Sequence, residues 1–218
     1  MSRVTETEFS IQPISNDQLE ETANCHISAF PDSFASKLGI NYVKKMLEWY
    51  IVSEDRFLLG VLFENNIVGY VGGSKGYGST SGMLQYAYWQ GLTSIAARPN
   101  LLFNFTLFSH VGLISRNVFE RIYKYPRKKE LSATKIPHDN TELSIGLVVI
   151  GVHQDFRRKG IGSILLKAFT EKSFEIGGFY GHLSVKTTNT NAIKAYQKNG
   201  WKITHSMKNS ETLKIRIR

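Results

Sequence analysis

The feature that most constrains the fold is a hydrophobic segment followed by a basic, glycine-containing turn and an amphipathic helix. Residues 147–152 form a mostly β-branched run with Gly151 inside it, which predicts a buried strand with a bulge or a close backbone approach. A basic turn follows, and apolar residues then repeat at helical spacing from Ile161 to Phe169. We therefore predict a strand, a turn and a helix in this order.

The turn has the chemistry of an anion site. The first N–H groups of a helix lack partners and lie at the positive end of its dipole, so they can donate to phosphate oxygens. Glycines at 160 and 162 would let a ligand approach the backbone closely, and residues 157–159 are all basic. The spacing fits neither a P-loop nor a dinucleotide fingerprint. A different anionic cofactor is therefore indicated.

Two blocks of sequence resemble one known family. The pattern Arg157-x-x-Gly160-x-Gly162 after a hydrophobic strand resembles the pyrophosphate loop of the GCN5-related N-acetyltransferases (GNAT), which bind acetyl-coenzyme A. A second block is similar to the family's closing helix, and it comprises Asn189, Ala192, Tyr196 and Gly200-Trp201. The two blocks cover about the last third of the chain. The alternative is a helix whose glycines serve only tight packing and whose arginines are solvated.

The resemblance implies an α+β fold of the GNAT acyl-coenzyme A acyltransferase type, with a twisted, mostly antiparallel sheet of about seven strands flanked by helices. It implies transfer of an acetyl group from acetyl-coenzyme A to a primary amine, without a metal. The six histidines show no metal-ligand spacing. The implied cofactor-binding residues are Ile150, Val152, Arg157, Arg158, Lys159, Gly160, Ile161, Gly162, Ser163 and Asn189.

Tyr196 is the candidate catalytic residue, because by resemblance it lies where the family often places a tyrosine near the cofactor sulfur, and a phenol can return a proton to a departing thiolate. Its alternative role is a core tyrosine, and Asn189 could equally be a helix cap. By resemblance, the strand splays at a bulge that Gly151 makes easy, and it presents backbone groups near Ile150 and Val152 to the pantetheine arm and thioester.

The general base is left open by the sequence. Glu142 is the nearest acidic residue on the strand, but at ~3.3 Å per residue it lies too far from Gly151 to reach the thioester. His182 and His153 are alternatives, although a lone histidine on a strand is more often packed or solvated. Some relatives carry a glutamate at the position of Gly146, so a water chain is the other alternative.

Hydrophobic periodicity places further elements along the chain. Asn16 or Asp17 is expected to cap a first helix that ends at Pro31. The remaining expected elements are strands near 9–14, 56–63, 67–72, 143–152, 179–185, 201–207 and 213–217, and helices over 33–51 and 190–198.

Residues 73–140 are expected to be a helical, basic and aromatic insertion between strands three and four of a single domain spanning 1–218. Its start is glycine-rich and reads as flexible. The insertion, with Ala29-Phe30-Pro31 and Leu38-Gly39, resembles acetyltransferases of bacterial surface-polysaccharide gene clusters. One interpretation is an acceptor-side cover that selects anionic substrates; the other is a lid or subunit interface with solvated charges. The basic residues concerned are Arg116, Arg121, Lys124 and Arg127.

The charge distribution and the cysteine content limit the expected binding partners and the expected cellular compartment. The net charge of +9 is unevenly distributed: residues 1–72 carry ten acidic and five basic side chains, a net of −5, whereas residues 73–218 carry a net of +14. Coenzyme A is itself anionic, and nucleic acid is the competing partner. With Cys25 as the only cysteine, no intramolecular disulfide can form, and a cytoplasmic protein without a membrane span is expected.

Three functional classes follow. The first is an acetyltransferase acting on a small-molecule amine, with an amino sugar or sugar nucleotide preferred, no nucleic-acid partner, and a homodimer left open. The second is a basic nucleic-acid-binding module, for which Arg127–Lys129 and Arg157–Lys159 would supply phosphate contacts. The third is a protein that binds acyl-coenzyme A without turnover.

Overall fold

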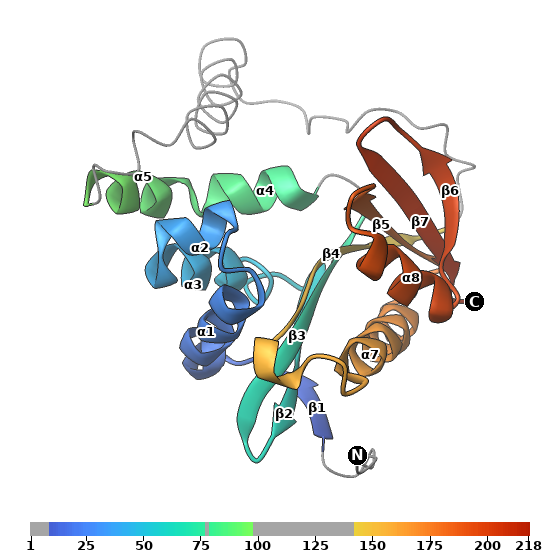
Figure 1. Cartoon of the computed structure of the whole chain (residues 1–218), viewed down its shortest axis with the longest axis horizontal. Helices are drawn as coiled ribbons and strands as arrows, with labels where there is room; N and C mark the ends of the chain where they lie inside the picture. The colour runs from blue at the N-terminus through green and yellow to red at the C-terminus, as the bar shows by residue number, and fades with distance from the viewer. Residues whose placement is uncertain (1–8, 77–78, 98–141) are drawn as a thin grey trace.

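The computed structural model describes residues 9–76, 79–97 and 142–218. Within these ranges seven strands form one sheet in the order β1-β2-β3-β4-β5-β7-β6 (Figure 1). Every neighbouring pair is antiparallel except β4 and β5. The strands are β1 Phe9–Pro13, β2 Arg56–Phe63, β3 Asn66–Lys75, β4 Ser144–Val152, β5 Tyr180–Lys186, β6 Lys202–Ser206 and β7 Ser210–Arg216. The predicted mixed, mostly antiparallel sheet of seven strands is confirmed.

Helices cover both faces of the sheet, and each face has its own core. On one face, helices α1 to α5 pack around residues such as Tyr50 and Tyr70. On the other, α7 and α8 pack around Phe169 and Trp201, which are 0% and 2% exposed. Each such side chain contributes about 1.5–3 kcal/mol through burial. The helices are α1 Leu19–Ala29, α2 Phe34–Leu38, α3 Ile40–Glu48, α4 Ser79–Tyr86, α5 Tyr88–Ala96, α7 Ile161–Glu175 and α8 Thr190–Lys198.

Local backbone chemistry corrects two expectations in the first third of the chain. The single helix expected over 33–51 is wrong: Gly39 has a φ of 93°, which separates α2 from α3. The cap expected at Asn16 or Asp17 is also wrong: Ser15 is the N-cap of the segment that precedes α1, and its N–H donates to Gln18 Oε1 at 3.2 Å. A short 3₁₀ helix, Asn16–Gln18, then leads into α1.

Strand β4 contains a bulge, but the bulge lies at Val148 and not at Gly151. Gly72 and Gly73 of β3 pair with Val149 and Leu147, which leaves Val148 without an opposite residue. As a result, Val148 and Val149 both pack against the core on the α1 face, although successive strand residues normally alternate.

The other prediction for Gly151, a close approach to its backbone, explains why a glycine lies here. A β-carbon built there would lie 2.8 Å from Tyr70 Cε1 and 3.0 Å from Phe30 Cε2. The residue itself stays in register opposite Tyr70. It therefore makes room for two aromatic rings, and the strand deforms elsewhere.

Strands β4 and β5 pair over only three residues and then separate. Gly146 and His182 form the last pair, and beyond them β4 continues with β3 while β5 continues with β7. Figure 1 shows the two parts of the sheet diverging on either side of this point. The wedge between β4 and β5 is called the splay below.

The described part of the insertion is more regular than its glycine content predicts. Gly73 and Ser74 belong to β3, where they pair with Leu147 and Gly146, so the expected flexible start at residue 73 is wrong. Helices α4 and α5 follow and pack against α3. Residues 98–141, which include Arg116, Arg121, Lys124 and Arg127, lie outside the described ranges. Across those ranges, no helix combines the length and apolarity that a membrane crossing requires.

A buried polar pair joins α1 to β3 beneath Gly151. The Nδ1 atom of His26 and the hydroxyl of Tyr70 share a hydrogen bond, and the two residues are 5% and 0% exposed. His26 Nε2 has no partner among the described residues. Burial lowers the pKa of His26 to about 4 and raises that of Tyr70 well above 10.

This burial predicts acid sensitivity. The unfolded chain protonates His26 near pH 6.5, whereas the folded chain keeps it neutral until about pH 4. The lowered pKa gives stability that is complete above pH 6.5 and is lost as the pH falls from there to about 4. The loss should be at most about 3 kcal/mol in the free energy of unfolding. We expect His26→Asn to reduce the change in the free energy of unfolding over this pH range, measured by urea titrations at several pH values.

The control is His205→Gln, at an exposed position on β6. It should keep the parental pH slope. An unchanged slope in His26→Asn would contradict the assignment, whatever the absolute stability of that variant.

Candidate active site

The first turn of α7 presents backbone donors that have no partner in the described part of the chain. Gly160 is the N-cap, with a φ of 86°. Hydrogen bonding begins with Ser163 and Ile164, whose N–H groups donate to the Gly160 carbonyl at 2.9 and 3.2 Å. The N–H groups of Ile161 and Gly162 precede this ladder and therefore stay available. A helix start of this kind attracts an anion through both its donors and its dipole.

Gly160 and Gly162 do not serve packing within the described structure. A β-carbon built on either residue meets no heavy atom within 4 Å. Gly160 is required by its left-handed conformation, but Gly162 lies in ordinary helical backbone, where alanine would be the better helix former. Close packing against the described residues therefore does not explain these two glycines. The space beside Gly162 fits a group that approaches the helix start from outside.

The three basic residues of the turn have different surroundings. The Arg157 guanidinium donates to the Ala29 carbonyl at 2.7 Å, and so ties the turn to the end of α1. The Lys159 ammonium lies 4.6 Å from the centre of the Phe156 ring. Arg158 has a φ of 62°, a conformation uncommon outside glycine. All three keep positive charge close to the start of α7.

The bulge determines which backbone groups of β4 face the splay. The His153 N–H donates to the Val68 carbonyl of β3 at 2.9 Å, which makes this a hydrogen-bonded pair. In an antiparallel ladder such pairs alternate, so Gly151 and Val149 also direct their N–H and C=O groups to β3. The backbone groups of Ile150 and Val152 therefore point the other way, toward the splay. Without the bulge, the N–H and C=O groups of Gly151 and Val149 would face the splay instead.

Tyr196 has features of both roles that the sequence left open. Its ring is 9% exposed and packs against Trp201 with centroids 6.0 Å apart, as a core residue would. Its hydroxyl makes no hydrogen bond to a described residue, and the hydroxyl oxygen is not completely buried. Burial raises the pKa of this phenol to about 12, so it stays protonated at neutral pH.

Asn189 acts as the N-cap of α8, because its side chain accepts from the Ala192 N–H at 3.3 Å. The cap interpretation is therefore the one observed, and contact with a pantetheine arm stays a prediction.

Sequence reasoning missed Asn199, whose Nδ2 donates to Ser163 Oγ at 3.1 Å and to the Ala195 carbonyl at 2.8 Å. This side chain links the end of α8 to the start of α7.

The proton acceptors considered from the sequence lie at different points along β4 and β5. Glu142 is exposed just before β4 begins. His153 lies beyond the other end of β4, where its Nδ1 accepts from the Asp155 N–H at 3.4 Å. His182 lies at the start of the splay, with Nδ1 2.9 Å from Ser144 Oγ. In the described ranges no three His, Cys, Asp or Glu side chains gather as a metal site would require.

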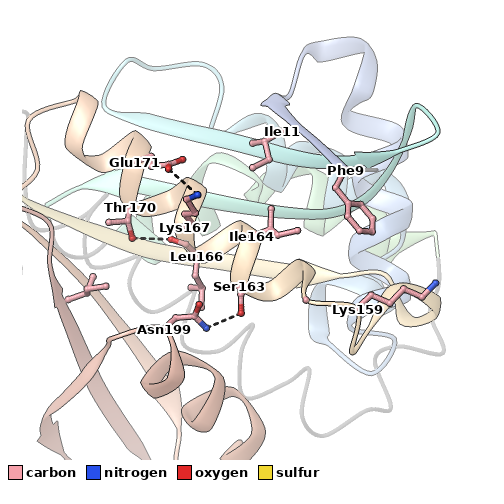
Figure 2. Close-up of a pocket in the computed structure, with 12 residues that line it drawn as sticks. Phe9, Ile11, Lys159, Ser163, Ile164, Leu166, Lys167, Thr170, Glu171 and Asn199 are labelled. Atoms are coloured by element: carbon pink, nitrogen blue, oxygen red, sulfur yellow. Dashed lines mark hydrogen bonds and ion pairs between the residues drawn. The ribbon is translucent and has the colours of Figure 1, made fainter. Parts of the chain in front are cut away.

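A groove of about 780 Å³ runs along the outer side of α7 and reaches its first turn. Figure 2 shows Ser163 and Asn199 joined at one wall, with Lys159 extending from the turn. The wall on the other side is apolar and comes from Phe9 and Ile11 of β1. The groove meets the turn from outside, whereas the splay opens beyond the last pairing of β4 with β5.

Comparisons with known proteins agree with this geometry. Residues 131–201 match the family model described as the acetyltransferase (GNAT) family. The sequence matches no curated protein. Among solved structures, the PaiA N-acetyltransferase of Thermoplasma acidophilum in complex with coenzyme A is similar at 13% identity and a TM-score of 0.57, covering 95% of this chain and 98% of that one.

Two further structures show the same fold. A GNAT-family acetyltransferase from Streptococcus pneumoniae has 13% identity and a TM-score of 0.55, and covers 97% of this chain and 100% of its own. An aminoglycoside 6′-acetyltransferase type Ii has 12% identity and a TM-score of 0.58, with 96% and 97% covered. The chain thus has the GNAT fold. Its residues 131–201 carry the sequence signature of that family, which confirms the resemblance.

Proposed function

We propose that the protein is an acetyl-coenzyme A-dependent N-acetyltransferase that acts as a single domain over residues 1–218. The observation that carries the proposal is the start of α7, where available N–H groups, flanking cations and an unfilled space beside Gly162 coincide. Those features fit a pyrophosphate, which needs donors, positive charge and close access to the backbone.

The residues of the splay fit the rest of the cofactor. Polar backbone groups at Ile150 and Val152 face a region without a strand partner, so they can hold an amide-containing arm and orient a carbonyl. The bound thioester supplies the acetyl group. Tyr196 then supplies a proton for the sulfur, because its phenol is protonated at neutral pH and makes no hydrogen bond to a described residue.

Two observations weigh against a nucleic-acid-binding module. One of its expected contacts, Arg157, is already bonded to the Ala29 carbonyl. The polar backbone groups of Ile150 and Val152 at the splay also have no role in phosphate binding along a nucleic acid. Arg127–Lys129 lies outside the described residues. A protein that binds acyl-coenzyme A without turnover is separated from the enzyme only by measuring transfer.

We expect a small primary amine as the acceptor, with an amino sugar or amino-sugar nucleotide preferred. One structural neighbour is an aminoglycoside acetyltransferase, and the basic insertion would suit an anionic acceptor. A panel containing these amines, a polyamine and a peptide N-terminus should give the highest kcat/KM for the amino sugars. Preference for the peptide would contradict the acceptor class, and no transfer to any amine would favour the non-catalytic alternative.

The cofactor site can be tested by separating stability from binding. We expect Gly162→Ala to leave the free energy of unfolding unchanged or raise it by up to about 1 kcal/mol, because alanine favours the helix and meets no neighbour. The same methyl group should weaken acetyl-coenzyme A binding roughly tenfold, about 1.4 kcal/mol, in titration calorimetry. Gly162→Asp should weaken it further by repelling phosphate.

Thr204→Asp, on exposed β6, is the matched control and should bind like the parent. If both Gly162 variants bind acetyl-coenzyme A with parental affinity, the assignment of the phosphate site to the start of α7 is wrong.

The role of Tyr196 can be tested with Tyr196→Phe, which keeps the packed ring and removes the proton donor. We expect kcat to fall about 10²-fold or more, with the acetyl-coenzyme A dissociation constant within about twofold of the parent. Because the pKa of Tyr196 is about 12, ionisation of this phenol should cause no loss of activity up to about pH 10. Tyr42→Phe removes a hydroxyl in the other core and serves as the control. Parental turnover in Tyr196→Phe would leave Tyr196 a core residue only.

A further inference from the structure

His182 lies at the point where β4 and β5 separate. It forms the last residue pair between the two strands, opposite Gly146. Its neighbours Gly181 and Leu183 face the α7 core, so the His182 side chain lies on the sheet face that carries α1 to α5. The imidazole thus borders the splay from the face opposite α7.

The ring is held from β4. Ser144 Oγ lies 2.9 Å from Nδ1, across 38 residues of sequence. The contact orients the imidazole, and in the tautomer in which Nδ1–H donates to the Ser144 hydroxyl oxygen the lone pair is on the other nitrogen, Nε2. Ser144 is therefore a positioning residue.

Gly146 makes the space that the ring occupies. A β-carbon built on Gly146 would lie 3.2 Å from Nε2 and 3.3 Å from Cε1 of His182, closer than ordinary van der Waals contact. Ser144 and Gly146 are two residues apart on one strand face, so one anchors the imidazole and the other accommodates it. The bulge at Val148 follows at once, about 7 Å further along the strand.

We propose that His182 is the general base of the reaction and that Ser144 orients it. The inference rests on the proposed acetyltransferase function. The neutral amine nitrogen bonds to the acetyl carbon while the carbon–sulfur bond breaks. The proton of the amine passes to His182 Nε2, directly or through one water, and the sulfur takes a proton from Tyr196. Exchange with solvent then returns His182 to its neutral form and Tyr196 to its protonated form.

This arrangement also assigns the acceptor to one side of the sheet. The phosphate-binding turn belongs to the α7 face, whereas His182 borders the splay from the face of α1 to α5. The amine therefore meets the thioester from the side on which α4 contacts β4.

Several titratable groups face the same side as His182 and must be distinguished from it. Lys214 is directly opposite on β7, and Lys202 of β6 pairs with Lys214. Tyr180 and Lys186 lie on the same face of β5. On β4 and β3 the nearest side-chain positions of this face, Ser144, Gly146 and Ser74, carry no charge.

The test uses the full chain, acetyl-coenzyme A and the best amine of the panel. His182→Gln should lower kcat about 10²-fold at neutral pH and change the acid limb of the kcat profile, which reports groups in the bound complex, while acetyl-coenzyme A affinity stays within about twofold. Ser144→Ala should lower kcat less, by roughly tenfold, and move the acid limb without removing it. His205→Gln, on exposed β6, should match the parent throughout.

A second variant keeps the test informative if His182→Gln fails to fold. His182→Ala leaves a space, and added imidazole should restore part of its kcat without changing cofactor affinity. Turnover of His182→Gln within about threefold of the parent with an intact acid limb, or no imidazole rescue of His182→Ala, would overturn the assignment of the base. A parent protein that binds acetyl-coenzyme A but acetylates no amine would instead refute the proposed function itself.

Discussion

One residue without a partner, Val148, organises the candidate site. Its insertion into β4 reverses the alternation of the ladder, so that Ile150 and Val152 turn their backbone groups away from β3. Those groups would pair with a neighbouring strand if β5 continued alongside, but the pairing ends at Gly146. Polar backbone at the centre of a sheet requires a partner, and here a ligand can provide it. The bulge and the splay therefore act together.

The second half of the site is held by contacts to elements outside the strand–turn–helix unit. Arg157 anchors the turn to the Ala29 carbonyl at the end of α1, and Asn199 anchors Ser163 to the end of α8. The donors of Ile161 and Gly162 are thus supported from both sides of α7 before any ligand arrives. Prealigned donors need no reorganisation on binding, which favours affinity. Of the flanking basic side chains, Arg157 has a structural role as well as a charge.

Sequence reasoning succeeded where the signal is local and failed where it depends on distant contacts. The glycine spacing at 160 and 162, the strand before it and the closing helix with Tyr196 are local patterns, and the structure has the corresponding elements. The bulge was assigned to Gly151 because glycine tolerates deformation, yet that glycine accommodates Tyr70 and Phe30. Asn199 with Ser163, and His182 with Ser144, join residues 36 and 38 positions apart, which no periodicity predicts.

In the proposed reaction, the two faces of the sheet divide the chemistry between them. The face of α7 and α8 supplies the anion-binding helix start and the phenol of Tyr196, whereas the face of α1 to α5 supplies the His182 imidazole. A donor and an acceptor that enter from opposite faces can meet only where the sheet is open, and the described sheet opens where β4 leaves β5. Lengthening the pairing beyond Gly146 would close that passage and satisfy the same backbone groups internally. For the proposed enzyme, the short parallel ladder would therefore be the structural condition for bringing two substrates together.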